Sequence, residues 1–300
     1  MSQRVLITGG SGFVGRAVSR RLVQSGIKVI SCSRSGAPAF HADENHWTSS
    51  PLIDWVNVDC LESEQMDTLI ETYKPTAYVH AVGALLEKSN YKSVIDPFTS
   101  IASLAGMLGG NTSSNANNGN SSSNESAHPI TPDYNVINRD SLSSVVDCVN
   151  RTTSSTTSTT DTSSKIPFVF VSAFAAPPLV DQRYIESKRE AEEILFSSSS
   201  LRPIVMRPGF LYSEERDWSM ALAGLLQLSS SAHKGPLVGI SSMVRSMLPP
   251  GVDMSFAVHP PLRVEILADA IVQSILEDSV FGILEGSDIN NTSNSCGPLE

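Results

Sequence analysis

Two residues that could perform acid–base chemistry, Tyr184 and Lys188, stand four positions apart in the segment YIESK. In a helix this spacing places a phenol and an ammonium group on the same face, one turn apart. A free tyrosine, with a pKa of about 10, is a poor proton donor or acceptor at neutral pH. A neighbouring cation stabilises the phenolate, so we expect Lys188 to lower the pKa of Tyr184 and suit it to general acid–base catalysis.

A glycine-rich segment near the N-terminus, TGGSGFVG from Thr8 to Gly15, has the spacing of a dinucleotide-binding loop. It follows an apolar segment and opens a helical pattern, which is where such loops hold a phosphate. Gly9 would permit the tight turn, Gly12 would let the backbone approach a pyrophosphate, and Gly15 would let the helix pack closely. Free N–H groups and the helix dipole would then bind the anion. A glycine-rich turn without a ligand is the alternative.

The residues after the second predicted strand bear on the choice between NAD and NADP. An NAD site carries Asp or Glu there for the ribose 2′-hydroxyl, whereas this chain has Ser33, Arg34 and Ser35. Arg34 offers a forked cation for a 2′-phosphate, and the serines offer hydroxyl groups. We therefore expect NADP(H), with an exposed loop arginine as the alternative. Asp59, at the end of the third predicted strand, is expected to bind the adenine amino group.

The arrangement that must position these residues is an alternation of apolar strands and amphipathic helices. Alternation of this kind predicts an α/β fold, a Rossmann-type doubly wound parallel sheet with right-handed crossovers. After the fourth strand, Val82 and Gly83 are small enough to let the chain pass beside the dinucleotide. The predicted strands are Arg4–Thr8, Lys28–Ser33, Trp55–Val58, Ala77–Val82, Ile166–Ser172 and Pro203–Arg207, and the predicted helices are Phe13 to Gly26, Glu62–Tyr73, Asp140–Val149, Tyr184–Phe196, Trp218–Leu228 and Val264–Leu276.

Two polar tracts, at about 109–126 and 152–164, lack apolar periodicity, and we predict that both are disordered surface insertions. Around them we expect residues 1–212 to form the NAD(P)-binding domain. Residues 213–290 are expected to form a small C-terminal lobe over the strand ends, for a substrate or a partner. Residues 291–300 are expected to be a disordered tail. Glu190, Glu192 and Glu193 are expected to form a solvated helix face.

Composition narrows the classes of partner. The 300 residues are 40% hydrophobic and carry a net charge of −10, which argues against nucleic acid as a main partner. No apolar run is long enough to span a membrane. The four cysteines and six histidines form no ligand spacing, so we expect no metal. No secretory signal or Arg-rich presequence is recognisable, so we expect any organellar address to be cryptic. The apolar stretch 220–226 is expected in the core; a pocket for a hydrophobic substrate or a lipid contact is the alternative.

The motifs TGGSGFVG, IPFVFVS, YIESK and MRPGF, in this order, resemble the short-chain dehydrogenase/reductase superfamily, of its extended or atypical kind. Three segments are similar to those of the atypical reductases of fungal coenzyme Q biosynthesis: HAVGALLEKSNYK, YIESKREAE and RPIVMRPGFLY. These reductases are relatives of the NADPH-bearing accessory subunit of mitochondrial complex I. The resemblance covers most of the chain outside the polar tracts. It implies NADP(H), a coenzyme Q biosynthetic complex as partner, and a location on the matrix side of the mitochondrial inner membrane, with peripheral membrane contact as an option.

The resemblance also implies roles for individual residues. Lys188 would hydrogen-bond the nicotinamide ribose in addition to acting on Tyr184, and Asn138 would be a structural or proton-relay residue. By position, Gly9, Ser11, Gly12, Phe13 and Val14 match the phosphate loop, Ser33 and Arg34 the 2′-phosphate site, Asp59 the adenine contact, Tyr184 and Lys188 the catalytic pair, and Pro208, Gly209 and Phe210 the segment that lines the nicotinamide.

One departure from the superfamily pattern concerns the serine that holds the substrate carbonyl. Ser172 stands one position early, and Ala173 occupies the expected place. Ser172 would serve as the third catalytic residue only if the loop shifts. Three hypotheses therefore stay open: a reductase or oxidase acting on a quinone-precursor carbonyl, a non-catalytic NADPH-binding scaffold of a mitochondrial complex, and a sugar-nucleotide epimerase or reductase.

Overall fold

The computed structural model describes residues 3–37, 46–83, 133–156, 165–176, 180–214 and 260–294. Its centre is a seven-stranded sheet in which all strands are parallel, in the order β3-β2-β1-β4-β5-β6-β9. The order reverses between β1 and β4, so the predicted doubly wound sheet is confirmed. The strands are β1 Arg4–Thr8, β2 Lys28–Ser33, β3 Ile53–Asn57, β4 Ala77–His80, β5 Ile166–Val171, β6 Leu201–Arg207 and β9 Gly282–Glu285, and a separate pair consists of β7 Leu211–Tyr212 and β8 Leu262–Arg263.

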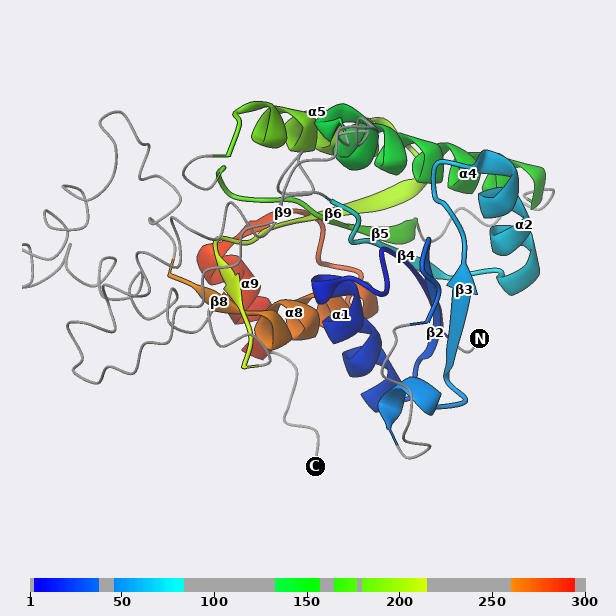
Figure 1. Cartoon of the computed structure of the whole chain (residues 1–300), viewed down its shortest axis with the longest axis horizontal. Helices are drawn as coiled ribbons and strands as arrows, with labels where there is room; N and C mark the ends of the chain where they lie inside the picture. Colours follow the sequence, from blue (N-terminus) through cyan, green and yellow to red (C-terminus); the bar gives the residue numbers. More distant parts are fainter. Residues whose placement is uncertain are drawn as a thin grey trace, which may run out of the picture.

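Helices cover both faces of the sheet (Figure 1). α1 (Phe13–Gln24), α8 (Val264–Leu276) and α9 (Gly286–Asn294) enclose one apolar core against the strands. α2 (Ser63–Tyr73), α4 (Ser141–Thr156) and α5 (Arg183–Ser197) enclose the other. Because both faces are covered, the inner strands are apolar throughout, as the fully buried Val5, Leu6 and Ile7 of β1 show.

α4 is longer than the predicted helix Asp140–Val149 and enters the tract 152–164 that was expected to be disordered. A π-helical turn over Asn135–Asp140 leads into it, and it continues to Thr156. The hydroxyl groups of Thr152, Thr153 and Ser154 donate to backbone carbonyls one turn earlier. The hydroxyl groups of this polar segment are thus satisfied within the helix. Because the segment has no apolar periodicity, the sequence pattern did not predict that it is helical. The tract 109–126 and the predicted helix Trp218–Leu228 lie outside the described residues.

The prediction of a separate lobe over residues 213–290 is wrong for its described C-terminal part. β9 is the seventh strand of the main sheet, α8 packs against α1, and α9 packs against α8. The expected tail is also wrong for residues 291–294, which are the last turn of α9. Arg202 on β6 ties this part down, because its guanidinium donates to the carbonyls of Ser274, Ile275 and Glu277 at the end of α8. A cation there satisfies carbonyls that lack helical partners.

Candidate functional site

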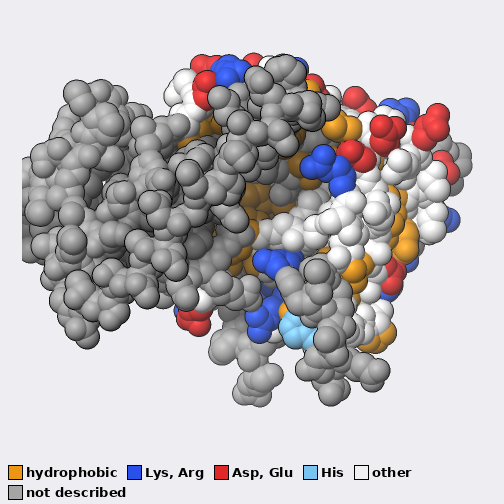
Figure 2. Space-filling view, viewed as in Figure 1, with side chains coloured by type: hydrophobic (Ala, Val, Ile, Leu, Met, Phe, Trp, Pro, Cys, Tyr) orange, Lys and Arg blue, Asp and Glu red, His pale blue; other side chains and the backbone are white. Residues whose placement is uncertain are grey.

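The candidate site lies where the strand order reverses, beyond the carboxyl ends of β1 and β4. The two strands are neighbours, and α1, which follows β1, and α4, the next described α-helix after β4, pack on opposite faces of the sheet, as at the ligand crevice of doubly wound folds. Figure 2 shows a hollow on this side, near the amino end of α1, with hydrophobic side chains in its floor and Lys or Arg side chains on its described rim.

The glycine loop is shaped by close backbone approaches. Gly9 has φ +76°, and a Cβ there would lie 2.9 Å from the carbonyl carbon of Ala81 beyond β4. At Gly15 a Cβ would lie 2.2 Å from the carbonyl oxygen of Gly9, so α1 can approach the loop only without a side chain. Gly12 is the N-cap of α1, with no side-chain cap. The first N–H groups of α1 therefore point to the place where the sequence predicts a pyrophosphate.

Gly10 has a role that the glycine spacing alone did not reveal. Its N–H donates to the carbonyl of Cys32, and a Cβ would lie 1.9 Å from the Oγ of Ser31. Ser31 is fully buried on β2, and its hydroxyl has no hydrogen-bond partner within the described structure. The loop is thus seated on β2 as well as on β4. Phe13 and Val14 begin α1 half-buried, and Val14 packs on the apolar core beneath the helix.

Four polar side chains gather at the end of β2. The Oγ of Ser35 lies 3.0 Å from the Oγ of Ser11 in the glycine loop and 3.4 Å from that of Ser33, which donates to the carbonyl of Gly36. Arg34 is exposed between them, and in the described part of the chain it makes no hydrogen bond or ion pair. The structure thus brings Ser11 of the glycine loop to Ser33 and Ser35, on either side of Arg34 in the sequence, and the 2′-phosphate site stays a prediction.

Asp59 follows β3 on the same edge of the sheet. Its carboxylate accepts a hydrogen bond from the N–H of Leu61 at 3.1 Å, which fixes the turn before α2. Next to it, burial and the charge of Asp59 raise the pKa of the Cys60 thiol to about 11, and the charge of Arg34 acts in the opposite direction. Asp59 and Arg34 are therefore both near enough to Cys60 for their charges to act on its thiol, and the adenine contact of Asp59 stays a prediction.

Lys188 lies in the interior, one turn after Tyr184 on α5. Its ammonium donates to the carbonyls of Val171 (3.1 Å) and Val82 (3.3 Å) and lies 4.8 Å from the ring centroid of Phe170. Burial lowers its pKa to about 7. A Cβ on Gly83 would lie 2.8 Å from its Nζ, so a side chain at that position would displace the ammonium. Val82 and Gly83, which were predicted to lie beside the dinucleotide, thus stand directly against Lys188.

Tyr184 does not have the lowered pKa that the spacing suggested. Burial, and secondarily Tyr134, raise its pKa to about 12, and the opposing charge is that of Arg189. The ring of Tyr134 meets it edge-on with 5.9 Å between centroids. The prediction is wrong because Lys188 is itself desolvated and bonded to carbonyls, so burial dominates at the phenol.

Asn138 joins this cluster from the π-helical turn before α4. It is fully buried, its Nδ2 donates to the Oγ of Ser187 at 3.0 Å, and Ser187 donates to the carbonyl of Tyr184. Its Oδ1 lies 3.3 Å from the position of a Cβ on Gly83. π-helical turns recur at functional sites because they turn one side chain out of the regular helix. Here the turn brings Asn138 to α5.

Ser172, predicted as a catalytic residue, uses its hydroxyl elsewhere. The buried side chain donates to the carboxylate of Glu192 on α5 and accepts from Arg189 at 3.3 Å. Ala173, not Ser172, belongs to the buried cluster of Tyr134 and Tyr184. Glu192 itself corrects an expectation: it is 3% exposed and not part of a solvated face, whereas Glu190 and Glu193 are exposed.

The segment Pro208–Phe210 continues β6 on the same edge. The carbonyl of Pro208 accepts from the N–H of Phe174 at 3.0 Å, and the carbonyl of Phe210 accepts from that of Leu262 at 2.8 Å. These bonds tie the segment, which the resemblance expects to line the nicotinamide, to the connection after β5 and to β8.

His80 at the end of β4 links the start of the glycine loop to the start of α4, a role that its sequence position did not indicate. Its Nδ1 lies 2.7 Å from Thr8 Oγ1, and its Nε2 lies 3.2 Å from Ser141 Oγ. Since Ser141 donates to the carbonyl of Ile137, Nε2 must carry the hydrogen and Nδ1 must accept from Thr8. Burial, together with the charge of Lys188, lowers the pKa of His80 to about 3.

This pKa predicts an acid sensitivity that removal of His80 diminishes. An unfolded histidine has a pKa of about 6.5, so between pH 6.5 and 3 the unfolded chain binds a proton that the folded chain does not. His80 therefore lowers the free energy of unfolding as pH falls below 6.5, by at most about 1.4 kcal/mol per pH unit. We expect His80→Gln to be less stable than wild type at pH 7.5 and to lose less stability on acidification. Urea unfolding at pH 7.5, 6, 5 and 4.5 measures the free energy of unfolding of each protein and its change with pH. If the free energy falls equally with pH in the two proteins, the low pKa assigned to His80 is contradicted.

Within the described ranges, no group of three or more His, Cys, Asp or Glu residues could hold a metal ion. None of the described helices is long and apolar enough to cross a membrane.

Comparisons with known proteins agree with this architecture. Residues 5–100 match the model of the NAD dependent epimerase/dehydratase family. MIOREX complex component 2 of Saccharomyces cerevisiae is 29% identical over 219 residues, which cover 72% of this chain and 76% of that protein. An uncharacterized chloroplastic protein of Arabidopsis thaliana is 26% identical over 289 residues, 94% of this chain and 74% of that protein.

Solved structures share the fold. The UDP-glucose 4-epimerase of Bifidobacterium longum, in complex with NAD+ and UDP, superposes with a TM-score of 0.54 at 14% identity, over 94% of this chain and 77% of that one. The UDP-glucose 4-epimerase of Thermus thermophilus, in complex with NAD, gives a TM-score of 0.52 at 14% identity, over 97% of this chain and 81% of that one. At this identity the likeness shows the fold.

Proposed function

Because this chain has the fold of the short-chain dehydrogenase/reductase-like epimerases and matches the NAD dependent epimerase/dehydratase family over residues 5–100, we propose that it is an NADPH-binding oxidoreductase of coenzyme Q biosynthesis. Its substrate would be a quinone-precursor carbonyl. We further propose that it acts in the mitochondrion, on the matrix side of the inner membrane, with proteins of the biosynthetic complex as partners. The location, pathway and partners rest on the sequence resemblance, and the relative named as a complex component supports assembly with other proteins.

The observation that carries the cofactor assignment is the group of three hydroxyls at the end of β2, where the chain also has an exposed arginine. Ser35 lies within hydrogen-bonding reach of Ser11 and of Ser33. Arg34 stands between two of these serines in the sequence, a combination that is suited to a 2′-phosphate. The glycine loop also supports the assignment, since side chains at Gly9 and Gly15 would collide with the backbone of Ala81 and of the loop itself and so change its shape. The residues present therefore fit a dinucleotide that carries a phosphate on its adenosine ribose.

The site residues would divide the chemistry as follows. When bound, NADPH supplies a hydride. With its pKa raised to about 12, Tyr184 is protonated at neutral pH, so its hydroxyl can hydrogen-bond a carbonyl oxygen and has a proton to give, although this pKa lies above the range that suits a general acid. Lys188, whose ammonium is held by the carbonyls of Val82 and Val171, would hydrogen-bond the nicotinamide ribose. Asn138 and Ser187 hold the backbone of α5 at Tyr184.

A non-catalytic NADPH-binding scaffold is the second candidate, favoured by the engagement of Ser172. The hydroxyl that would hold a substrate carbonyl is bonded to Glu192, and Ala173 stands in the expected place. A sugar-nucleotide epimerase is the third candidate, and its support is the fold likeness alone.

Titration of the purified, cofactor-free protein with NADPH and with NADH tests the proposal. We expect tighter binding of NADPH. In Arg34→Asp we expect NADPH affinity to fall roughly 10- to 100-fold, as for the loss of a charge-assisted hydrogen bond, with little change for NADH. Arg20→Asp makes the same charge change at an exposed position of α1 and should leave both affinities as they are.

Three outcomes would contradict the proposal, two of them the 2′-phosphate site and one the cofactor assignment as a whole. Equal affinity for the two dinucleotides, or an Arg34→Asp variant that retains the preference, would refute the 2′-phosphate site. Failure of the wild type to bind either dinucleotide would refute the cofactor assignment.

A further inference from the structure

Helix α5 carries a third buried polar side chain in line with Tyr184 and Lys188. Glu192 follows Lys188 by four residues, so the three side chains lie on one face at successive turns. The carboxylate of Glu192 is 4% exposed. A carboxylate this deeply buried is costly unless cations and hydrogen-bond donors compensate it.

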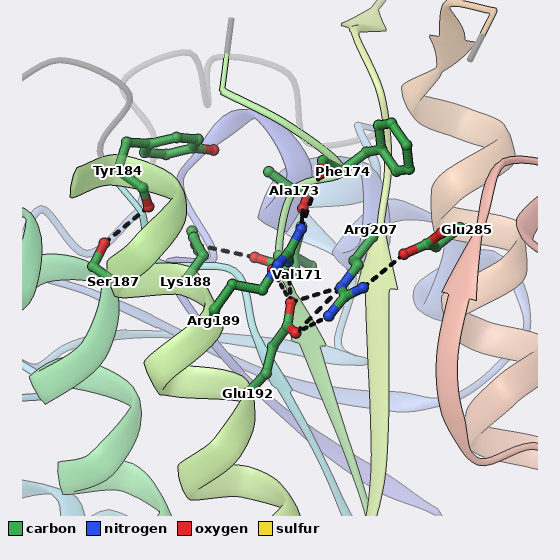
Figure 3. A network of polar contacts seen from close by, with 11 residues as sticks. Val171, Ala173, Phe174, Tyr184, Ser187, Lys188, Arg189, Glu192, Arg207 and Glu285 are labelled. Atoms are coloured by element: carbon green, nitrogen blue, oxygen red, sulfur yellow. Dashed lines mark hydrogen bonds and ion pairs between the residues drawn. The ribbon is translucent and has the colours of Figure 1, made fainter. Parts of the chain in front are cut away.

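The compensation comes from the ends of β5 and β6, which lie at the same edge of the sheet, and from α5 itself (Figure 3). Arg207 at the end of β6 binds Glu192 through two nitrogen atoms and also binds Glu285 at the end of β9, at 2.8 Å. Arg189 binds Glu192 from the preceding turn of α5, and Ser172 donates to it from the end of β5. Two arginines and two glutamates make a cluster without net charge, in which Glu192 is the shared acceptor.

The cluster holds the segment that lines the candidate site. The second guanidinium nitrogen of Arg189 donates to the carbonyls of Ala173 (3.0 Å) and Phe174 (2.9 Å). Ala173 packs with Tyr184, and the carbonyl of Val171 accepts from Lys188. The orientation of Arg189, and with it the path of residues 172–174, therefore depends on the carboxylate of Glu192.

We propose that Glu192 is a positioning residue of this site: its buried carboxylate orients Arg189 and Arg207 and so fixes residues 172–174 against Tyr184 and Lys188. Its effect on NADPH rests on the proposed function. It also explains why Ser172 is placed away from the substrate position, since its hydroxyl is one of the donors that satisfy Glu192.

The ammonium of Lys188 reports directly on this carboxylate. The titratable groups that face it in the described structure are Glu192 and Tyr184 on α5 and His80 on β4. Of these, His80 and Tyr184 are uncharged at neutral pH, and Glu192 is the one that stabilises the charged amine against burial. Loss of its charge should move the titration of Lys188 to lower pH.

The experiment compares Glu192→Gln with Glu190→Gln, the same change at an exposed position of α5 that pairs with Arg139. Lysine labelled with ¹³C at Cε gives the titration midpoint of Lys188 by NMR, with Lys188→Met to assign the signal. NADPH fluorescence gives the dissociation constant, and a thermal melt shows that each variant is folded. We expect Glu192→Gln to bind NADPH roughly 10-fold more weakly, as for the loss of about one charged contact, and to titrate Lys188 at lower pH. Glu190→Gln should match wild type in both.

A folded Glu192→Gln with the wild-type dissociation constant and the wild-type Lys188 midpoint would overturn the proposal, because a role in stability alone changes only the melt. If Glu192→Gln does not fold, Arg189→Gln releases the carbonyls of Ala173 and Phe174 and keeps the pair of Glu192 with Arg207. It should then weaken NADPH binding, and unchanged binding would overturn the proposal. If the wild type binds no NADPH, the proposed function fails, while the Lys188 titration still decides the role of Glu192.

Discussion

A single methyl group at Gly15 is expected to abolish dinucleotide binding. A Cβ at this position would lie 2.2 Å from the carbonyl oxygen of Gly9, 2.7 Å from the Cα of Gly10 and 2.9 Å from the carbonyl carbon of Gly9. All three atoms are backbone, so no side chain can rotate to make room. In Gly15→Ala, α1 must move away from the loop, and the N–H groups at its start move with it. We expect NADPH affinity to fall by more than about 100-fold, because backbone groups at a helix start bind a phosphate only when they are correctly placed.

The change should also destabilise the fold, since overpacking costs about 1–3 kcal/mol. Gly26→Ala provides the matched control. Gly26 has φ +72°, so alanine is strained there by about 1–2 kcal/mol, but nothing lies within 4 Å of its Cβ position. It should lower the thermal midpoint to a comparable extent and leave NADPH affinity unchanged. Equal affinities for the two variants would show that the packing of Gly15 does not shape the binding loop.

The elements whose bounds the sequence predicts well are those delimited by glycine or proline residues nearby in the chain. β1, β2 and α8 have the predicted bounds, because a glycine loop, a helix stop at Gly26 and a proline pair before α8 delimit them. β9 and α9 were missed for the opposite reason. β9 is a four-residue strand, and α9 has the polar sequence GSDINNTSN with Ile289 as its one fully buried apolar side chain. Their position is set by docking on β6 and α8, which is a tertiary effect.

The candidate site divides in a similar way. Spacing along the chain located the glycine loop, Arg34 and the Tyr184–Lys188 pair, because each is a local pattern on one loop or helix. It did not locate the partners that determine protonation. Glu192 stands in REAEEI, which looks like a solvated helix face, and its burial is compensated by Arg207 from β6 together with Ser172 and Arg189. The direction of the Tyr184 pKa shift followed the same rule, since the burial of Tyr184 and of Lys188 depends on the packed strands around them.

Removal of the Tyr184 hydroxyl is the change with the largest expected effect on turnover. With its pKa raised to about 12, Tyr184 is protonated at neutral pH, so it has a proton to give to a carbonyl oxygen and cannot act as a base toward an alcohol. We expect Tyr184→Phe to lower kcat for NADPH-dependent reduction of a quinone-precursor carbonyl by about 10²- to 10⁴-fold, the usual contribution of a general acid. Its NADPH affinity should stay within about twofold of wild type, because the contact to the cofactor is assigned to Lys188.

Tyr134→Phe is the matched control for this prediction. Tyr134 is also buried, and its ring meets that of Tyr184 edge-on, so the variant removes a hydroxyl from the same cluster. We expect it to lower kcat by less than about tenfold, since its hydroxyl takes no part in the proton transfer. A Tyr184→Phe protein that turns over substrate at the wild-type rate, or that restores quinone levels in a deletion strain, would refute the catalytic hypothesis. Tight NADPH binding in that same variant would then favour the scaffold, because the cofactor would be held at a site whose acid group is not used.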